Sequence, residues 1–66
     1  MKADKQKTKM AMARACMSNG EISEAAGLPK QTVKNVLYGR SVKPCTLGKV
    51  ARALGVDVAE IIAKED

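Results

Sequence analysis

Apolar residues recur at helical spacing along most of the chain, and glycine or proline separates the later segments from one another. Positions three and four apart lie on one face of a helix, so each segment predicts an amphipathic helix with one buried side. The segments are about 3–16, 18–26, 29–38, 46–54 and 58–64, with brief connections between them. The pattern therefore predicts an all-α domain of five short helices.

The stretch from Ser18 to Gly39 carries the clearest local signals. Ser18 and Glu21 have the spacing of a capping box, in which the hydroxyl and the carboxylate each accept a hydrogen bond from a backbone N–H. Gly27 ends the first helix, because a residue without a Cβ adopts the left-handed conformation cheaply. A second helix follows from residue 29 or 30, so the stretch predicts two helices joined by a tight turn, a helix-turn-helix.

The second helix of this pair has two unlike faces. Val33, Val36 and Leu37 recur at helical spacing and predict the buried face. The opposite face has cations and amides but no carboxylate, and it consists of Lys30, Gln31, Lys34 and Asn35. Lysine and amide side chains can reach base edges, and lysine also pairs with phosphate. A purely structural hairpin constrains only the buried face, so the exposed face is what indicates nucleic-acid binding.

The first segment has two competing apolar stripes, and its first residues are expected to fray. The stripes consist of Thr8, Met12 and Ala15 in one phase, and of Met10, Ala13 and Met17 in the other. After Gly39, residues 40–45 are predicted to form a loop, because Pro44 cannot continue a helix.

The net charge is +5, and the basic residues are unevenly distributed. No acidic residue lies between Glu24 and Asp57, and this gap contains Lys30, Lys34, Arg40, Lys43, Lys49 and Arg52. A second basic group marks the first helix, namely Lys2, Lys5, Lys7, Lys9 and Arg14. Acidic residues gather at the C-terminus, namely Asp57, Glu60, Glu65 and Asp66. A basic side suits a polyanion; the simpler alternative is a generally basic surface that favours solubility.

Several other classes are disfavoured. No segment approaches the ~20 apolar residues of a membrane span, and the N-terminus has no apolar signal-peptide core. Cys16 and Cys45 form no CxxC pair, and the chain has no His, so no metal site is expected. Both thiols are expected to be reduced, half-buried side chains in a cytoplasmic protein. Without a nucleophile–base pair or a Gly-rich phosphate loop, we expect no enzyme activity and no cofactor.

Taken together, these segments resemble the helix-turn-helix domain of the phage repressor, Cro and Xre type, the lambda-repressor-like fold. The resemblance covers about residues 3–63, and it is strongest in Ser18 to Gly39 and in the run TLGKVARALGVDVAEII from Thr46 to Ile62. It implies a compact five-helix lambda-repressor-like domain over residues 1–66. The function implied is that of a sequence-specific DNA-binding transcriptional regulator.

The resemblance also implies roles for individual residues. The family's recognition helix matches residues 29–38, and its base-reading positions fall on Lys30, Gln31, Lys34 and Asn35. Gln31 stands where many members have a Gln that reads adenine, a pairing that the geometry of the amide suits. The positions that contact phosphate fall on Asn19, Tyr38, Arg40, Ser41 and Lys43.

Four positions depart from the family pattern. Pro29 stands where a hydroxyl residue usually caps the recognition helix, so that cap bond is lost. Met12 and Leu37 occupy the positions of a frequent Arg–Glu pair, and a packing contact is predicted in its place. Cys45 stands where some relatives have an Arg that reaches the minor groove.

The mechanism implied places helix 29–38 in the major groove of double-stranded DNA. A module this small makes few contacts, so we expect a homodimer on a palindromic operator, with recognition helices ~34 Å apart. A monomer that pairs only on DNA is the alternative. The expected dimer surface contains Val58 and Ile61, with Ile62 in the core; the alternative is that all three side chains are buried.

Two other roles remain open at this point. The domain could be a protein-interaction module, such as an antirepressor or an antitoxin partner, although such a surface would be apolar or aromatic. The first helix could instead lie on a membrane surface or bind a partner, although its Met and Ala residues fit a core better. No small-molecule ligand site is evident in so short a chain.

Overall fold

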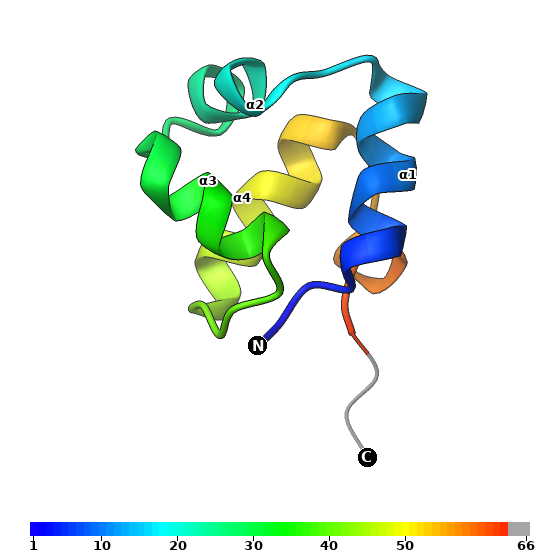
Figure 1. Cartoon of the computed structure of the whole chain (residues 1–66), viewed down its shortest axis with the longest axis vertical. Coiled ribbons are helices and arrows are strands. Elements are labelled where there is room, and N and C mark those ends of the chain that lie inside the picture. The colour runs from blue at the N-terminus through cyan, green and yellow to red at the C-terminus, as the bar shows by residue number, and fades with distance from the viewer. Residues whose placement is uncertain (64–66) are drawn as a thin grey trace.

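The computed structural model describes residues 1–63. Within these residues there are four α-helices and one 3₁₀ turn: α1 (Lys5–Ala15), α2 (Asn19–Ala26), α3 (Lys30–Leu37), α4 (Pro44–Leu54) and η1 (Val58–Glu60). In Figure 1, α4 runs through the middle of the view, with α2 and α3 on one side and α1 on the other. The predicted all-α architecture is confirmed, but the predicted fifth helix is a short 3₁₀ turn.

Both ends of α2 agree with the local signals in the sequence. The Ser18 backbone N–H donates to Glu21 Oε1 at 3.0 Å, and the Glu21 backbone N–H donates to Ser18 Oγ at 3.3 Å. The bond from the Ser18 backbone, and then that with its side chain, hold the pKa of the Glu21 carboxyl below its ordinary value. Gly27 ends the helix in the left-handed conformation with a φ of 68°. The predicted capping box and glycine stop are therefore confirmed.

Prolines stand at the start of the next two helices. Pro29 is the N-cap of α3 and provides no side-chain cap bond, as expected. Pro44 is not part of the connecting loop: it is the first residue of α4, where its missing N–H costs nothing and its fixed φ suits the helix. The prediction that this helix begins near residue 46 is therefore wrong, and the connection between α3 and α4 is residues 38–43 instead of 40–45.

The N-terminus is paired rather than frayed. The Met1 ammonium donates to the Val42 carbonyl at 2.9 Å, and the Val42 N–H donates to the Met1 carbonyl at 2.7 Å. Ala3 forms an antiparallel bridge with Ile62 and is 3% exposed. The first helix therefore begins at Lys5, after the Asp4 N-cap, and not at residue 3. Backbone pairing with distant segments explains why local helix propensity did not predict these residues.

The same bridge explains the missing fifth helix. The Asp4 N–H donates to the Ile61 carbonyl at 2.7 Å, and the Ala63 N–H donates to the Lys2 carbonyl at 2.9 Å. These residues cannot form a continuous helix and this bridge at once, so the helical turn ends at Glu60. The part of the predicted helix at residue 64 lies outside the described residues.

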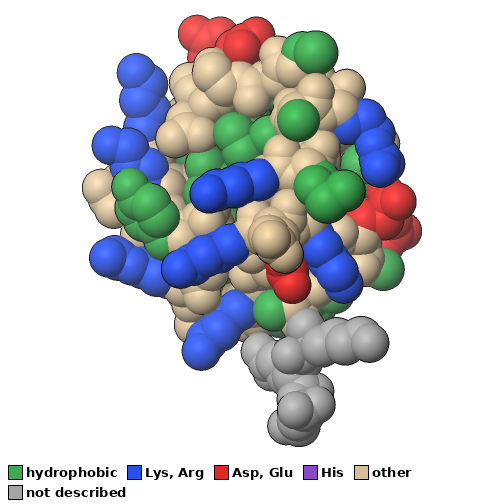
Figure 2. All heavy atoms as spheres, turned by 45° about the vertical axis from the view of Figure 1, so that its right-hand side comes forward, with side chains coloured by type: hydrophobic (Ala, Val, Ile, Leu, Met, Phe, Trp, Pro, Cys, Tyr) green, Lys and Arg blue, Asp and Glu red, His purple; other side chains and the backbone are tan. Residues whose placement is uncertain are grey.

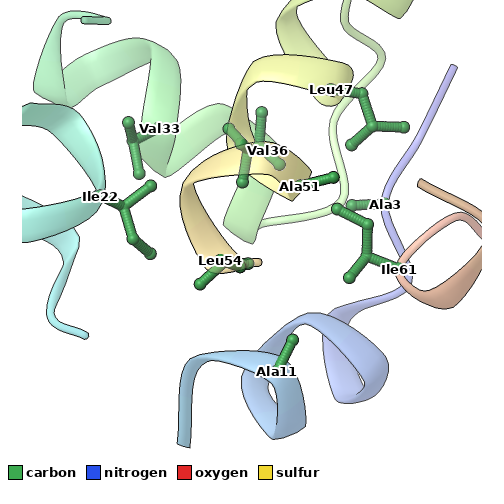
Figure 3. Packing of buried hydrophobic residues seen from close by; sticks show 10 residues of the cluster. Ala3, Ala11, Ile22, Val33, Val36, Leu47, Ala51, Leu54 and Ile61 are labelled. Carbon is green, nitrogen blue, oxygen red and sulfur yellow. The ribbon is translucent and has the colours of Figure 1, made fainter. Parts of the chain in front are cut away.

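Ile61 belongs to the core, which corrects its expected place on a dimer surface. Its side chain is fully buried and projects toward Ala3 and Ala51 (Figure 3). Val58 and Ile62 are half-buried and pack against the core. The reason is the bridge to the N-terminus, which draws residue 61 inward.

Apolar side chains from every helix meet around α4. Figure 3 shows Ile22 of α2, Val33 and Val36 of α3, and Ala11 of α1 placed around α4. The remaining members of the buried cluster are Ala3, Leu47, Val50, Ala51, Leu54 and Ile61.

The structure decides between the two stripes of α1. Thr8 is fully buried, and its hydroxyl donates to the Asp4 carbonyl at 2.7 Å, so the buried hydroxyl has a hydrogen-bond partner. Met12 and Ala15 are half-buried, whereas Met10 is 64% exposed. The stripe of Thr8, Met12 and Ala15 is therefore the buried one.

The two cysteines lie on the surface, contrary to the expectation that they are half-buried. Both Cys16 and Cys45 are free thiols with exposed side chains. Cys16 ends α1 in the left-handed conformation, with a φ of 54°. A side chain with a Cβ is strained there by ~1–2 kcal/mol relative to glycine. Gly27 and Gly55 adopt the same left-handed conformation at the ends of α2 and α4, but without a Cβ they are not strained.

Candidate nucleic-acid interface

The exposed side of α3 carries the four residues predicted to contact bases. Lys30, Gln31 and Lys34 are exposed, and Asn35 is half-buried. On the opposite side of the helix Val33 and Val36 are fully buried. The helical period of 3.6 residues separates the two groups, so packing of the valines against the core fixes the outward direction of the polar side chains.

These polar side chains are connected to one another. Gln31 Nε2 donates to Asn35 Oδ1 at 3.2 Å, and Arg40 Nη1 donates to the same oxygen at 3.2 Å. The Arg40 guanidinium also lies over the Tyr38 ring, 5.9 Å from its centroid. Two residues predicted to read bases are therefore joined to two residues predicted to contact phosphate.

The residues predicted to contact phosphate lie at the ends of α2 and α3. Tyr38, Arg40, Ser41 and Lys43 are exposed in and beside the α3–α4 connection. Asn19 is the first residue of α2, and it is also exposed. The first-turn N–H groups of a helix have no partner within the helix, and the helix dipole adds positive potential there. The capping box uses the Glu21 N–H and places the Glu21 carboxylate at the same end of α2, so only the N–H groups that precede Glu21 remain for an anion.

The α3–α4 connection is held in place by the start of the chain. Its backbone is joined at Val42 to Met1 by the two hydrogen bonds described above. Gly39 has a φ of 75°, and a Cβ built on it would lie 3.4 Å from Lys5 Cε and 3.5 Å from the Ala3 carbonyl oxygen. The segment around Met1 consequently lies beside the loop that carries Arg40 and Lys43.

The structure adds two lysines that the sequence did not assign to the site. Lys5 and Lys9 of α1 line a depression together with Asn19, Leu37 and Tyr38. Their spacing of four residues puts them on one face of α1, but only the packing of α1 against α3 brings that face beside the exposed side of α3. The two lysines therefore extend the basic surface from α3 onto α1.

Met12 lines the same depression as Leu37. Both side chains are half-buried and pack against the core. Their direct contact, expected as a substitute for an ion pair, stays a prediction.

Charge is unevenly distributed over the surface. In Figure 2, lysine and arginine side chains gather on the left and in the middle of the face shown, while most acidic side chains lie at its upper and right edges. An ion pair on the surface joins Arg14 Nη1 and Glu60 Oε1 at 4.0 Å, and at 68% and 54% side-chain exposure it contributes little to stability. Basic side chains on the α1–α3 side are thus available to a polyanion.

Residues 1–63 contain no group of three or more potential metal ligands. No helix among them has the length and apolar character needed to cross a bilayer.

Comparison with known proteins identifies one family. The sequence profile of the Cro/C1-type HTH DNA-binding domain matches residues 7–66, which is most of the chain. No curated protein and no solved structure matches the chain. The matched family is a DNA-binding domain and not an enzyme family.

Proposed function

The chain belongs to the Cro/C1-type HTH DNA-binding domain family, and on that premise we propose that it is a sequence-specific transcriptional regulator. Membership implies DNA binding; the regulatory role, the operator and the residues that read it are the proposal. The observation that carries it is the composition of the exposed side of α3, which has cations and amides but no carboxylate.

In the proposed complex α3 enters the major groove. Lys30, Gln31 and Lys34 lie at base edges, with Gln31 pairing with adenine through its amide. Asn35 completes the base-facing surface of the helix. This arrangement follows from the outward direction of these side chains and from the burial of the valines behind them.

Phosphate contacts fix the orientation of the domain on the duplex. The proposed contacts on one side of α3 come from the N-terminus of α2 at Asn19 and from Lys5 and Lys9 of α1. On the other side they come from Tyr38, Arg40, Ser41 and Lys43. Such contacts determine register and affinity, whereas base contacts determine sequence preference.

A module of this size makes few contacts, so we propose that two copies bind a palindromic operator, with recognition helices ~34 Å apart. With Ile61 in the core, Val58 remains as the predicted dimer contact near the C-terminus. Sedimentation velocity with and without operator DNA distinguishes a dimer in solution from one that forms only on DNA.

The decisive experiment is selection of bound DNA from a random pool at two salt concentrations. We expect a symmetric site, with log affinity falling by roughly 0.9 per phosphate contacted for each log unit of salt. Recovery of no preferred sequence would contradict sequence-specific regulation, and binding to a protein without any binding to DNA would favour the antirepressor or antitoxin-partner role.

Two substitutions separate the proposed roles. Gln31→Ala is expected to lower discrimination at one base pair by about 1–3 kcal/mol, because a bidentate amide–base pair is lost. Lys43→Ala is expected to weaken binding to all sequences alike and to reduce the salt slope by about 1. Binding to the full set of single-base operator variants is the measurement, and equal effects of both substitutions across that set would show that the roles are wrongly assigned.

A further inference from the structure

We infer that Arg40 determines the base preference of Gln31, and that it acts through Asn35. This inference rests on the proposed function, since it assumes that Gln31 reads a base. It adds to that function a reason why the Gln31 amide is presented in one orientation, and it assigns Asn35 a positioning role.

The argument starts from the chemistry of the guanidinium group. Arginine has only donors, so the Asn35 atom that faces Arg40 Nη1 must be the acceptor Oδ1. Gln31 meets the same Oδ1, and an acceptor can be met only by a donor, so Gln31 must present Nε2. The amide orientation of two side chains is thus imposed by the single donor-only group in the network.

The consequence appears at the outward edge of Gln31. One N–H of Nε2 is used by Asn35, which leaves the second N–H and the carbonyl Oε1 available. One donor beside one acceptor is the complement of adenine, which offers N7 as an acceptor and N6–H as a donor. In the opposite orientation Oε1 would be used, and two donors would face the groove, which suits the N7 and O6 acceptors of guanine.

Arg40 is held firmly enough to impose this orientation. Its backbone N–H donates to the Asn35 carbonyl at 3.0 Å, so the main chain places the residue at the end of α3. Its guanidinium also lies over the Tyr38 ring at 5.9 Å, an arrangement that favours a cation over an aromatic face.

The same bonds limit what Asn35 can do by itself. A carbonyl oxygen has two lone pairs, and Asn35 Oδ1 already accepts from both Gln31 and Arg40. Asn35 is also half-buried, whereas Gln31 is exposed. The Asn35 oxygen is therefore unavailable to a base and only its Nδ2 donors remain free of these bonds, so we assign Asn35 a positioning role toward Gln31, although the resemblance to relatives had implied a base contact.

The test measures binding to four duplexes derived from the DNA that the selection experiment recovers. The duplexes differ only at the base pair where Gln31→Ala relaxes discrimination, and each carries one of the four possible base pairs there. Asn35→Ala removes the shared acceptor, and Arg40→Leu removes the donor-only group. Asn35→Asp is the matched control for polarity, because a carboxylate offers acceptors to both neighbours. Met10→Ala, on the exposed side of α1, controls for unrelated effects, and thermal unfolding verifies that each variant is folded.

Three results are expected. Asn35→Ala lowers the preference for adenine by roughly tenfold, as expected when a bidentate amide–base pair loses its fixed geometry. Arg40→Leu shifts the preference from adenine toward guanine, because the amides are free to turn over. Asn35→Asp keeps the adenine preference but weakens binding to all four duplexes, because it adds a negative charge near the phosphates.

Two results would overturn the inference alone. In the first, Gln31→Ala relaxes discrimination, but Asn35→Ala and Arg40→Leu leave the adenine preference unchanged. In the second, Asn35→Asp loses the adenine preference as fully as Asn35→Ala does. If Gln31→Ala relaxes discrimination at no position, direct reading by this residue fails and the inference fails with it. Since Arg40 lies outside α3 and is exposed, its variant remains informative even if substitution of half-buried Asn35 destabilises the fold.

Discussion

Replacing Ile61 tests the most consequential difference between the sequence pattern and the structure. The side chain is fully buried beside Ala3 and Ala51. Removing one buried methyl group by Ile61→Val is expected to lower the free energy of unfolding by about 0.5–1.5 kcal/mol, and Ile61→Ala by about 2–5 kcal/mol. A domain of this length has a total stability of only about 3–10 kcal/mol, so the alanine variant is expected to be unfolded or nearly so.

The valine variant is therefore the quantitative one. A loss of 1 kcal/mol lowers the melting temperature of so small a domain by about 4–8 °C. Urea unfolding followed by circular dichroism gives the free energy directly, and it should be measured at two protein concentrations. Met10→Ala, at a side chain that is 64% exposed, is the surface control and is expected to change stability by less than about 0.5 kcal/mol.

The alternative, in which Ile61 lies on a dimer surface, predicts a different result. Truncation would then leave the stability of the monomer unchanged, and the unfolding midpoint would depend on protein concentration in the parent but less so in the variant. An Ile61→Val loss no larger than that of Met10→Ala would refute the core assignment.

Four further predictions concern helix ends. Ser18→Ala is expected to cost about 1 kcal/mol, because it removes the capping hydroxyl of α2, and urea unfolding measures it. Because the pKa of Glu21 is lowered in the folded state, the stability that its carboxylate contributes is complete above the ordinary pKa of 4.5 and is lost as the pH falls through the lower folded pKa. Glu21→Gln preserves the capping box but does not titrate, so the fall of the melting temperature at acid pH should become less steep. An unchanged fall would contradict the pairing of Glu21 with Ser18. Cys16→Gly is expected to raise the free energy of unfolding by about 0.5–1 kcal/mol, because the relief of left-handed strain exceeds the cost of the added conformational freedom of the unfolded chain. Cys16→Ala keeps a Cβ and should show no gain. Equal melting temperatures for the two variants would argue against strain at this position. Pro29→Ser restores a cap to α3 and should be more stable than Pro29→Ala by about 1 kcal/mol, unless the serine hydroxyl finds no N–H to accept from.

The recognition surface was predictable because its signals are local. The capping box at Ser18 and the glycine at residue 27 need only neighbouring residues, and both are present as expected. The exposed side of α3 follows from helical period once Val33 and Val36 are known to be buried. Lys5 and Lys9 were missed, because no local pattern tells which face of α1 adjoins α3.

Errors occurred where distant segments pair. The very N-terminus was expected to fray and residues 58–64 to form a helix, but the bridge between Ala3 and Ile62 contradicts both expectations. The same bridge accompanies the burial of Ile61, which the sequence pattern placed on a dimer surface with burial as the alternative. Pro44 was misplaced for a different reason: a proline that ends one element can equally begin the next, and sequence does not distinguish the two.

The sequence by itself determined four helices, two of their caps, and the polar composition of the α3 surface, because each depends on spacing within a few residues. Only the tertiary structure decided which side of α1 is buried, that Ala3 pairs with Ile62, and that Arg40 and Gln31 share one oxygen of Asn35. The physical reason is that backbone pairing and side-chain orientation between distant segments depend on the whole packed core, for which no short stretch of sequence carries a signal.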